Sequence, residues 1–164
     1  MSQTLVSIIM GSASDAGHLA SCRKALDNLG IGHEAKVLSA HRTPGELIEY
    51  LGTLDEKGVQ IVICAAGMAA HLGGVVAAHT RLPVFGVPIP SGTLAGVDAL
   101  LATVQMPGGV PVATMGIGSA GGKNAAYMAA RLLALHNSDI KANMDRVLEA
   151  DRQKVLSATL PEEY

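Results

Sequence analysis

A regular alternation of short apolar runs with longer amphipathic segments limits the fold more than any other feature of this sequence. Five runs predict strands, at 5–10, 34–38, 59–65, 83–88 and 110–117, and apolar residues at helical spacing predict helices over 15–30, 44–58, 122–137 and 139–157. This order builds βαβ units with parallel strands and helices on both faces of the sheet. Right-handed crossovers favour a three-layer α/β/α sandwich, a doubly wound parallel sheet of the flavodoxin-like or Rossmann-like kind.

Length and composition bound the protein to one domain over residues 1–164, with the helix 139–157 packing on it or on a neighbouring subunit. A hydrophobic content of 49% excludes intrinsic disorder. The net charge of -2 and the 2% of aromatic residues argue against nucleic acid or an anionic membrane as partner.

The N-terminal segment and the cysteines indicate the compartment. The apolar run within residues 1–10 is too short, and lacks the basic residues, for a signal peptide, and it is too short for a membrane span. Cys22 and Cys64 lie in apolar runs, which predicts buried free thiols and a cytoplasmic protein.

The second half of the chain carries very little charge. Between residues 59 and 130 the charged side chains are Arg81, Asp98 and Lys123, and the segment 125–135 is apolar almost all round. One domain of this size has little interior in which to bury such a segment, so we expect a homo-oligomer with alanine-rich helices at its centre. The alternative is a single, unusually buried central helix.

Two loops after predicted strands carry groups that suit a phosphorylated ligand, and a doubly wound sheet binds ligands at this end of its strands. In the loop 11–15, Ser12 and Ser14 can donate to phosphate at a helix N-terminus, and Asp15 can accept from a sugar hydroxyl. Helix caps of this composition are also common without a ligand. In the loop 39–44, Arg42 places a fixed cation beside a helix N-terminus, and the His41 imidazole is suited to proton transfer near neutral pH.

The third loop, 67–74, combines small residues with one imidazole, His71, and predicts a tight pocket. His79 follows on a similar helical face, but two histidines without a nearby acidic or cysteine partner make a poor metal site, so we expect no metal. The segment 116–121 reads GxGxxG. It follows the last predicted strand and lacks the acidic residue expected about twenty positions on, so close helix packing or a subunit contact explains its glycines better than dinucleotide binding.

Several blocks in order resemble the 5-(carboxyamino)imidazole ribonucleotide mutase family of purine biosynthesis, over about residues 5–136. The blocks are MGSASD (10–15), SAHRTP (39–44), AGMAAHLGG (66–74), PVFGVP (83–88), GVDALLATVQMPGGVPVAT (96–114) and GKNAA (122–126). The resemblance implies a flavodoxin-like α/β/α fold, an octamer, and no cofactor or metal. Two positions depart from it: the family often has Gly where Met68 stands, and commonly Pro where Gly73 stands.

By this resemblance, His41 is the catalytic acid and base. The substrate-binding residues that it implies are Ser12, Ser14, Asp15, Ser39, Arg42, Gly67, Ala69, Ala70, His71 and Leu72. Of these, Ser12, Ser14 and Arg42 would hold the phosphate, Asp15 would hold the ribose hydroxyls, and the turn 69–72 would enclose the carboxylate.

The implied reaction moves a carboxylate from the exocyclic nitrogen of the ribonucleotide to ring carbon 4, by decarboxylation and recarboxylation. It requires an acid/base and a small dry pocket that retains carbon dioxide. Two alternatives remain open at this point. One is the related animal-type carboxylase, which uses aminoimidazole ribonucleotide and free carbon dioxide, and the other is a non-catalytic nucleotide-binding module with the same fold.

Overall fold

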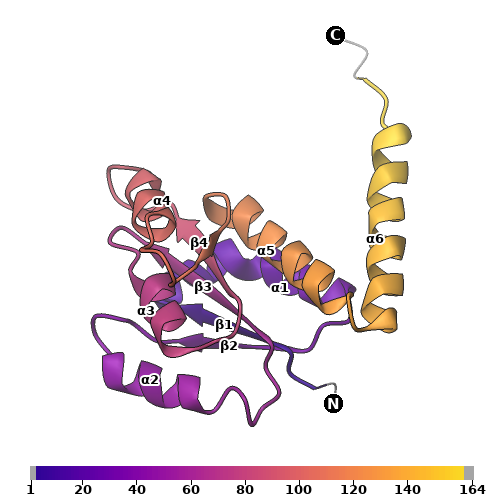
Figure 1. Cartoon of the computed structure of the whole chain (residues 1–164). Helices are drawn as coiled ribbons and strands as arrows, with labels where there is room; N and C mark the ends of the chain where they lie inside the picture. The colour runs from indigo at the N-terminus through magenta and orange to yellow at the C-terminus, as the bar shows by residue number, and fades with distance from the viewer. Residues whose placement is uncertain (1–2, 161–164) are drawn as a thin grey trace.

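In the computed structural model, which describes residues 3–160, five parallel strands form one sheet in the order β2-β1-β3-β4-β5 (Figure 1). The strands are β1 (Val6–Met10), β2 (His33–Val37), β3 (Ile61–Gly67), β4 (Val84–Ile89) and β5 (Ala113–Thr114). Register is regular, with Ile8 of β1 opposite Ala35 of β2 and Ile63 of β3. This strand order is that of flavodoxin-like doubly wound sheets, which confirms the predicted fold. The expected domain limits at 1–2 and 161–164 lie outside the described residues.

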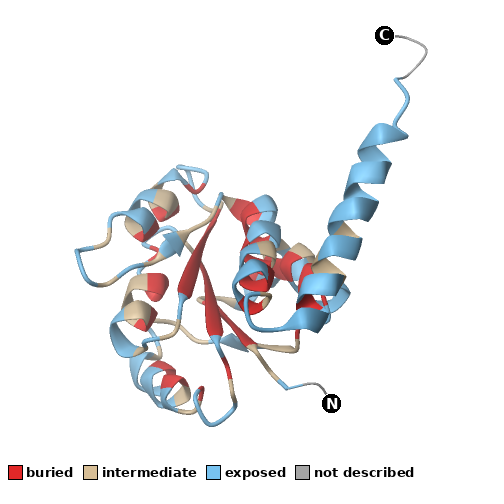
Figure 2. Ribbon diagram, turned by 45° about the vertical axis from the view of Figure 1, so that its right-hand side comes forward, coloured by how far each residue is buried: buried red, intermediate tan, exposed pale blue. Residues whose placement is uncertain are grey.

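Helices cover both faces of the sheet. They are α1 (Ala16–Asn28), α2 (Pro44–Gly52), α3 (Leu72–His79), α4 (Val97–Val104), α5 (Gly118–Leu133) and α6 (Ser138–Leu156), with a short 3-10 turn, η1 (Ala13–Asp15), before α1. On one face, α1 and α5 pack against each other and the sheet, and on the other lie α2, α3 and α4 (Figure 1). Helix α6 packs on α5 near its start, and most of its length is exposed (Figure 2).

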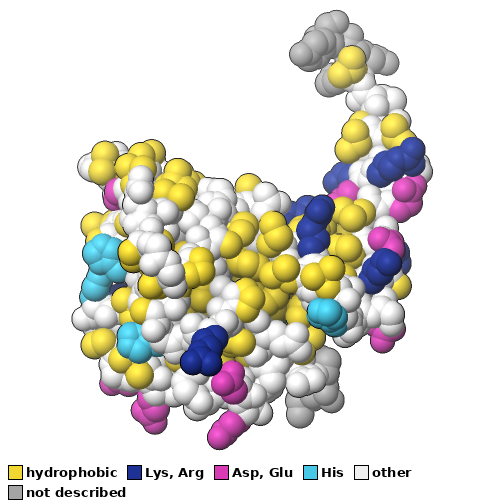
Figure 3. Space-filling view, viewed as in Figure 1, with side chains coloured by type: hydrophobic (Ala, Val, Ile, Leu, Met, Phe, Trp, Pro, Cys, Tyr) yellow, Lys and Arg dark blue, Asp and Glu magenta, His cyan; other side chains and the backbone are white. Residues whose placement is uncertain are grey.

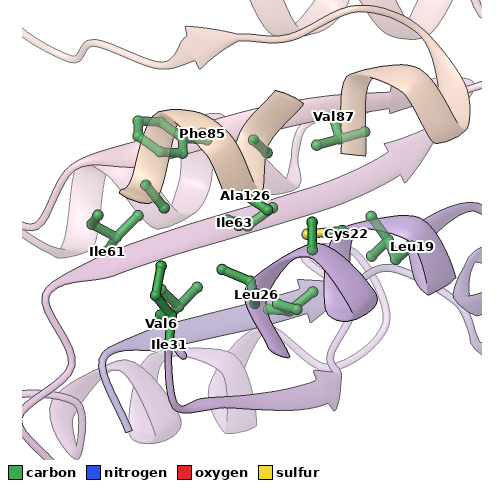
Figure 4. Packing of buried hydrophobic residues seen from close by; sticks show 14 of the residues in the cluster. Val6, Leu19, Cys22, Leu26, Ile31, Ile61, Ile63, Phe85, Val87 and Ala126 are labelled. Carbon is green, nitrogen blue, oxygen red and sulfur yellow. The ribbon is translucent and has the colours of Figure 1, made fainter. Parts of the chain in front are cut away.

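The hydrophobic core follows from the alternation of side chains along the central strands. Val6 and Ile8 of β1 point to the α1/α5 side with Ile63 and Phe85, whereas Ile9 points to the α2/α3 side. Figure 4 shows the first of these clusters, in which Cys22 of α1 and Ala126 of α5 meet the sheet. All of these side chains are buried, and at roughly 25 cal/mol per Å2 of apolar surface such burial is the main stabilising contribution.

Both cysteines are free and buried, as predicted from their apolar surroundings. Burial raises the pKa of the Cys22 thiol to about 12, because desolvation of the thiolate outweighs a backbone hydrogen bond from Ala126. Burial also raises the pKa of Cys64. Neither sulfur is a nucleophile at neutral pH.

Several predicted element bounds were wrong. The prediction for 110–117 gave too long a strand, since only residues 113–114 pair with β4 and Pro111 has no N–H to donate. Helix α2 ends at Gly52, not near residue 58. Helix α5 begins at Gly118, four residues before the predicted start. The prediction also assigned no helix to 97–104, where α4 lies.

Helix α5 shows why the segment 125–135 is so apolar. Its alanine face (Ala125, Ala126, Ala129 and Ala130) is 0% exposed within the single chain, because α1 covers it. Burial of the alanine face therefore needs no neighbouring subunit. Met128, Leu132 and Leu135 on the rest of the segment are exposed, and the expected homo-oligomer stays a prediction. The small side chains instead let two helices approach closely: a Cβ on Gly122 would stand 3.2 Å from Leu19 Cδ2 of α1.

The GxGxxG segment is likewise explained by packing. Gly118 has φ +73 and opens α5, and a Cβ on Gly121 would overlap the carbonyl oxygen of Gly116. The backbone of this turn folds against itself where a side chain would not fit.

Among residues 3–160, no helix is long and apolar enough to cross a membrane. Within the same range, no three His, Cys, Asp or Glu side chains are grouped closely enough to hold a metal ion.

Candidate functional site

A cavity of about 500 Å3 lies at the carboxyl ends of β1, β2 and β3, where the topology brings three loops together. Of the residues expected in the site, all but Ala70 and His71 line it. The lining residues are Gly11, Ser12, Ser14, Asp15, Ser39, Ala40, His41, Arg42, Ala66, Gly67, Met68, Ala69, Leu72 and Ser91. Ala70 is buried beneath the turn, and His71 is exposed beside His41.

The loop after β1 is folded into a compact turn by its own side chains. Ser12 caps η1: its hydroxyl accepts from the Ser14 backbone N–H at 3.3 Å, and its own N–H donates to Asp15 Oδ2 at 3.1 Å. The Ser14 hydroxyl donates to Ser12 Oγ at 2.8 Å. This reciprocal arrangement is a capping box, and it leaves the start of η1 and α1 facing the cavity.

Asp15 is the one buried acidic side chain among the residues that line the cavity. Burial raises the pKa of its carboxyl above the ordinary value, while the hydrogen bonds from Ser12 and Ser14 and the nearby positive charge of Arg42 act in the opposite direction. Asp15 caps α1 by its backbone position but makes no side-chain bond to that helix. Its oxygens are therefore held by the loop beside the cavity.

The loop after β2 presents His41 and Arg42 on a rigid frame. Ser39 Oγ accepts from the backbone N–H groups of both residues, at 3.3 and 3.2 Å. Thr43 Oγ1 accepts from the Ser39 N–H at 2.9 Å and donates to the Ser39 carbonyl at 3.2 Å. The Thr43 side chain thus closes this loop and makes no capping bond to α2, and Pro44 occupies the first turn of the helix.

Arg42 reaches from its own loop to the first one. Its Nη2 donates to the Gly11 carbonyl oxygen at 2.8 Å, so the guanidinium lies beside the turn that holds Ser12 and Ser14. A delocalised cation next to serine hydroxyls and a helix N-terminus is suited to bind a phosphate dianion.

The two imidazoles of the site are in direct contact. His41 Nε2 and His71 Nδ1 are 2.9 Å apart, and the rings meet edge to face at 89° with their centres separated by 5.0 Å. Both rings are exposed, and within residues 3–160 neither ring forms another side-chain hydrogen bond. Because one of the two nitrogens donates and the other accepts, the contact couples the tautomers of the rings.

The loop after β3 approaches the loop after β4 closely. A Cβ on Gly67 would collide with Ser91 Oγ and stand 3.1 Å from the Ile89 carbonyl oxygen, so this position requires glycine. Ser91 was absent from the expected site residues. The rule that ligands bind beyond the carboxyl ends of strands would have found it, had it been applied to the loop after β4 as well.

The family model described as AIR carboxylase matches residues 5–154 of this chain. The chain belongs to the AIR carboxylase family. One relative in the family is the N5-carboxyaminoimidazole ribonucleotide mutase of Bacillus subtilis, 48% identical over 157 residues, with 96% of this chain and 97% of the relative covered. The mutase of the same name from Pseudomonas aeruginosa is 54% identical over 129 residues, 79% of each chain.

A solved structure supports the same assignment of fold. The crystal structure of Treponema denticola PurE superposes with a TM-score of 0.84 at 30% identity, covering 93% of this chain and 94% of that one. The likeness therefore extends over nearly the whole length of both chains.

Proposed function

We propose that this chain is an N5-carboxyaminoimidazole ribonucleotide mutase, an isomerase of purine biosynthesis. It moves a carboxylate from the exocyclic nitrogen of 5-carboxyaminoimidazole ribonucleotide to ring carbon 4, giving 4-carboxy-5-aminoimidazole ribonucleotide. The observation that carries the proposal is the placement of the His41 imidazole in the wall of a cavity that also holds Ser12, Ser14 and Arg42. Relatives 48% and 54% identical that bear the mutase name support the same reaction.

The phosphate end of the substrate binds at the first two loops. Ser12, Ser14 and Arg42 donate hydrogen bonds to the phosphate, and Asp15 accepts from the ribose hydroxyls. Ser39 supports this end indirectly, since its hydroxyl already holds the backbone of His41 and Arg42. Binding energy at the phosphate fixes the aminoimidazole ring near His41.

The chemistry is a proton exchange coupled to the transfer of carbon dioxide. Protonated His41 gives its proton to the exocyclic nitrogen as the N–C bond breaks and carbon dioxide leaves. Carbon 4 of the ring then attacks the carbon dioxide to form the new C–C bond, and neutral His41 takes the proton from carbon 4. No electrons are gained or lost overall, and His41 returns to its starting state.

His71 is proposed to orient the reacting imidazole. Its Nδ1 lies 2.9 Å from His41 Nε2, and this contact limits the rotation of the His41 ring. Gly67, Ala69 and Leu72 offer the departing carbon dioxide an apolar wall, and buried Ala70 supports the turn from behind.

An assay with two substrates tests the proposal against its alternative, the carboxylase that the family description names. The purified protein is supplied with 5-carboxyaminoimidazole ribonucleotide or with aminoimidazole ribonucleotide, each with and without bicarbonate. A mutase converts the first without bicarbonate, whereas a carboxylase requires the second together with bicarbonate. If the protein converts neither substrate, the remaining alternative is a non-catalytic nucleotide-binding module.

We propose further that the protein acts in the cytoplasm as a homo-octamer, with residues 1–164 as one mutase domain. The number eight comes from the family resemblance. What supports self-association here is an apolar stripe on the outer side of α4 and the loop before it, formed by Leu94, Val97, Leu101 and Val104, each about half exposed or more. Figure 3 shows apolar surface over α4 and again between α5 and α6. The second area includes Met128, Leu132 and Leu148.

A further inference from the structure

Met68 combines an unfavourable backbone conformation with an exposed apolar side chain at the edge of the cavity. Its φ is +54, in the left-handed region that a residue with a Cβ rarely adopts. Its side chain is 60% exposed, and it lines the same cavity as His41. Strained residues of this kind persist where the surrounding structure requires them, often at functional sites.

The strained conformation belongs to the turn that places His71. The Ala70 N–H donates to the Met68 carbonyl at 2.9 Å, and the His71 N–H donates to the Ala69 carbonyl at 2.8 Å. This tight turn brings His71 to His41. Glycine would satisfy the same backbone freely, so the methionine at this position adds nothing to the turn except its side chain.

That side chain extends toward the loop after β4. Its Cγ lies 3.9 Å from the place where a Cβ on Gly92 would stand, and Gly92 adjoins Ser91 in the cavity wall. Met68 therefore connects the edges of two loops that flank the cavity. A flexible, polarizable thioether chain can adapt to a bound ligand while excluding water.

We propose that Met68 covers the mouth of the cavity and determines how much of the released carbon dioxide is recaptured. This rests on the proposed mutase activity. After the N–C bond breaks, carbon dioxide either forms the new bond at carbon 4 or escapes to solvent and leaves aminoimidazole ribonucleotide behind. A side chain across the opening slows escape without contributing a proton or an electron pair.

The test measures exchange with carbon dioxide from the medium. Wild type and the variants Met68→Gly, Met68→Ala and Met68→Leu convert 5-carboxyaminoimidazole ribonucleotide in buffer containing 13C-bicarbonate and carbonic anhydrase, and the label in the product is read by mass spectrometry. We expect little label with wild type and Met68→Leu. With Met68→Gly and with Met68→Ala we expect at least fivefold more label per turnover, and release of aminoimidazole ribonucleotide.

The alanine and glycine variants distinguish loss of the covering side chain from a change in the backbone of the turn. Alanine keeps the Cβ at the left-handed φ and removes only the thioether chain, whereas glycine also relaxes the backbone. Increased label with both supports the cover, and increased label with glycine alone, or with neither, overturns it. If wild type fails to convert the substrate, the proposed function itself has failed. Circular dichroism verifies that each variant is folded.

Discussion

At His41, proton transfer is separate from the groups proposed to hold the substrate. We expect His41→Asn to lower turnover by about 10²- to 10⁴-fold, the usual contribution of a general acid/base. Affinity for the ribonucleotide should stay within roughly tenfold of wild type, because Ser12, Ser14 and Arg42 are unchanged. Turnover followed by product absorbance, with binding by calorimetry, checks both parts. Near wild-type turnover would remove His41 as the acid/base.

Arg42 is the cation proposed for the phosphate. We expect Arg42→Ala to weaken ribonucleotide binding by about 1.5–3 kcal/mol, the range for a hydrogen bond to a charged group. The matched control is the ribonucleoside, which lacks the phosphate and should bind wild type and variant alike. A wild type that binds nucleoside and nucleotide equally would place the phosphate elsewhere.

The sequence predicted most residues of this site, but not the contacts and backbone conformations that depend on the folded structure. Ser12, His41 and Arg42 were predicted because polar side chains that follow parallel strands meet at one edge of the sheet. The contact between His41 and His71 was not predicted, because it joins loops thirty residues apart. Nor was the left-handed conformation of Met68, since methionine gives no local signal for positive φ.

At the scale of elements, a chain of hydrogen bonds connects β1 to β2 and α2, the strand and helix on either side of the His41 loop. Ser7 on β1 lies 2.7 Å from Tyr50 Oη on α2, and that hydroxyl donates to Glu34 of β2 at 2.8 Å. The single Tyr50 proton is thus used, so Ser7 donates to Tyr50. Lys57 Nζ donates to the same Glu34 oxygen at 2.9 Å.

We expect Tyr50→Phe to lower the free energy of unfolding by about 1–3 kcal/mol, because the Ser7 hydroxyl is 0% exposed and loses its partner. The double variant Ser7→Ala, Tyr50→Phe should recover most of this loss, since it leaves no unpaired hydroxyl. Urea unfolding of the four proteins in the cycle measures the coupling. Purely additive effects would contradict the role of the pair.

The same network sets a direction for pH dependence. Burial alone would raise the pKa of Glu34, but the hydrogen bonds from Lys57 and Tyr50 outweigh it and the pKa is lowered. At Glu34, the folded state therefore binds fewer protons than the unfolded chain. This contribution to stability is present above the ordinary glutamate pKa and is lost as the pH falls through the lowered one.

Element types were easier to predict than element bounds. The central strands β1, β3 and β4 were located to within two residues, because each is a buried apolar run closed by a turn. Helix α4 was missed because its outer side is apolar too, which hides the usual alternation. Helix α5 starts inside a glycine-rich segment that local propensity assigns to a loop, and tertiary packing overrides that propensity.

At the scale of the whole molecule, assembly can be tested without disturbing the core. Leu101 is 54% exposed on α4, whereas Ala129 is 0% exposed within the chain, so a charge at Ala129 would unfold the protein. We expect Leu101→Glu to reduce the molar mass seen by light scattering while the circular dichroism spectrum stays that of wild type. The control is Val37→Glu, at a residue that is 51% exposed on β2. An unchanged mass for Leu101→Glu would exclude the α4 stripe as an interface.

The two edges of the sheet determine how copies of this chain are able to associate. At one edge, β2 carries Glu34 and Lys36, and charges on an edge strand oppose pairing with another strand. At the other edge, β5 offers only Ala113 and Thr114. The sheet is thus a poor template for fibrils, and growth by strand addition is disfavoured in both directions. Copies that associate would then do so through helix surfaces, such as the proposed α4 stripe.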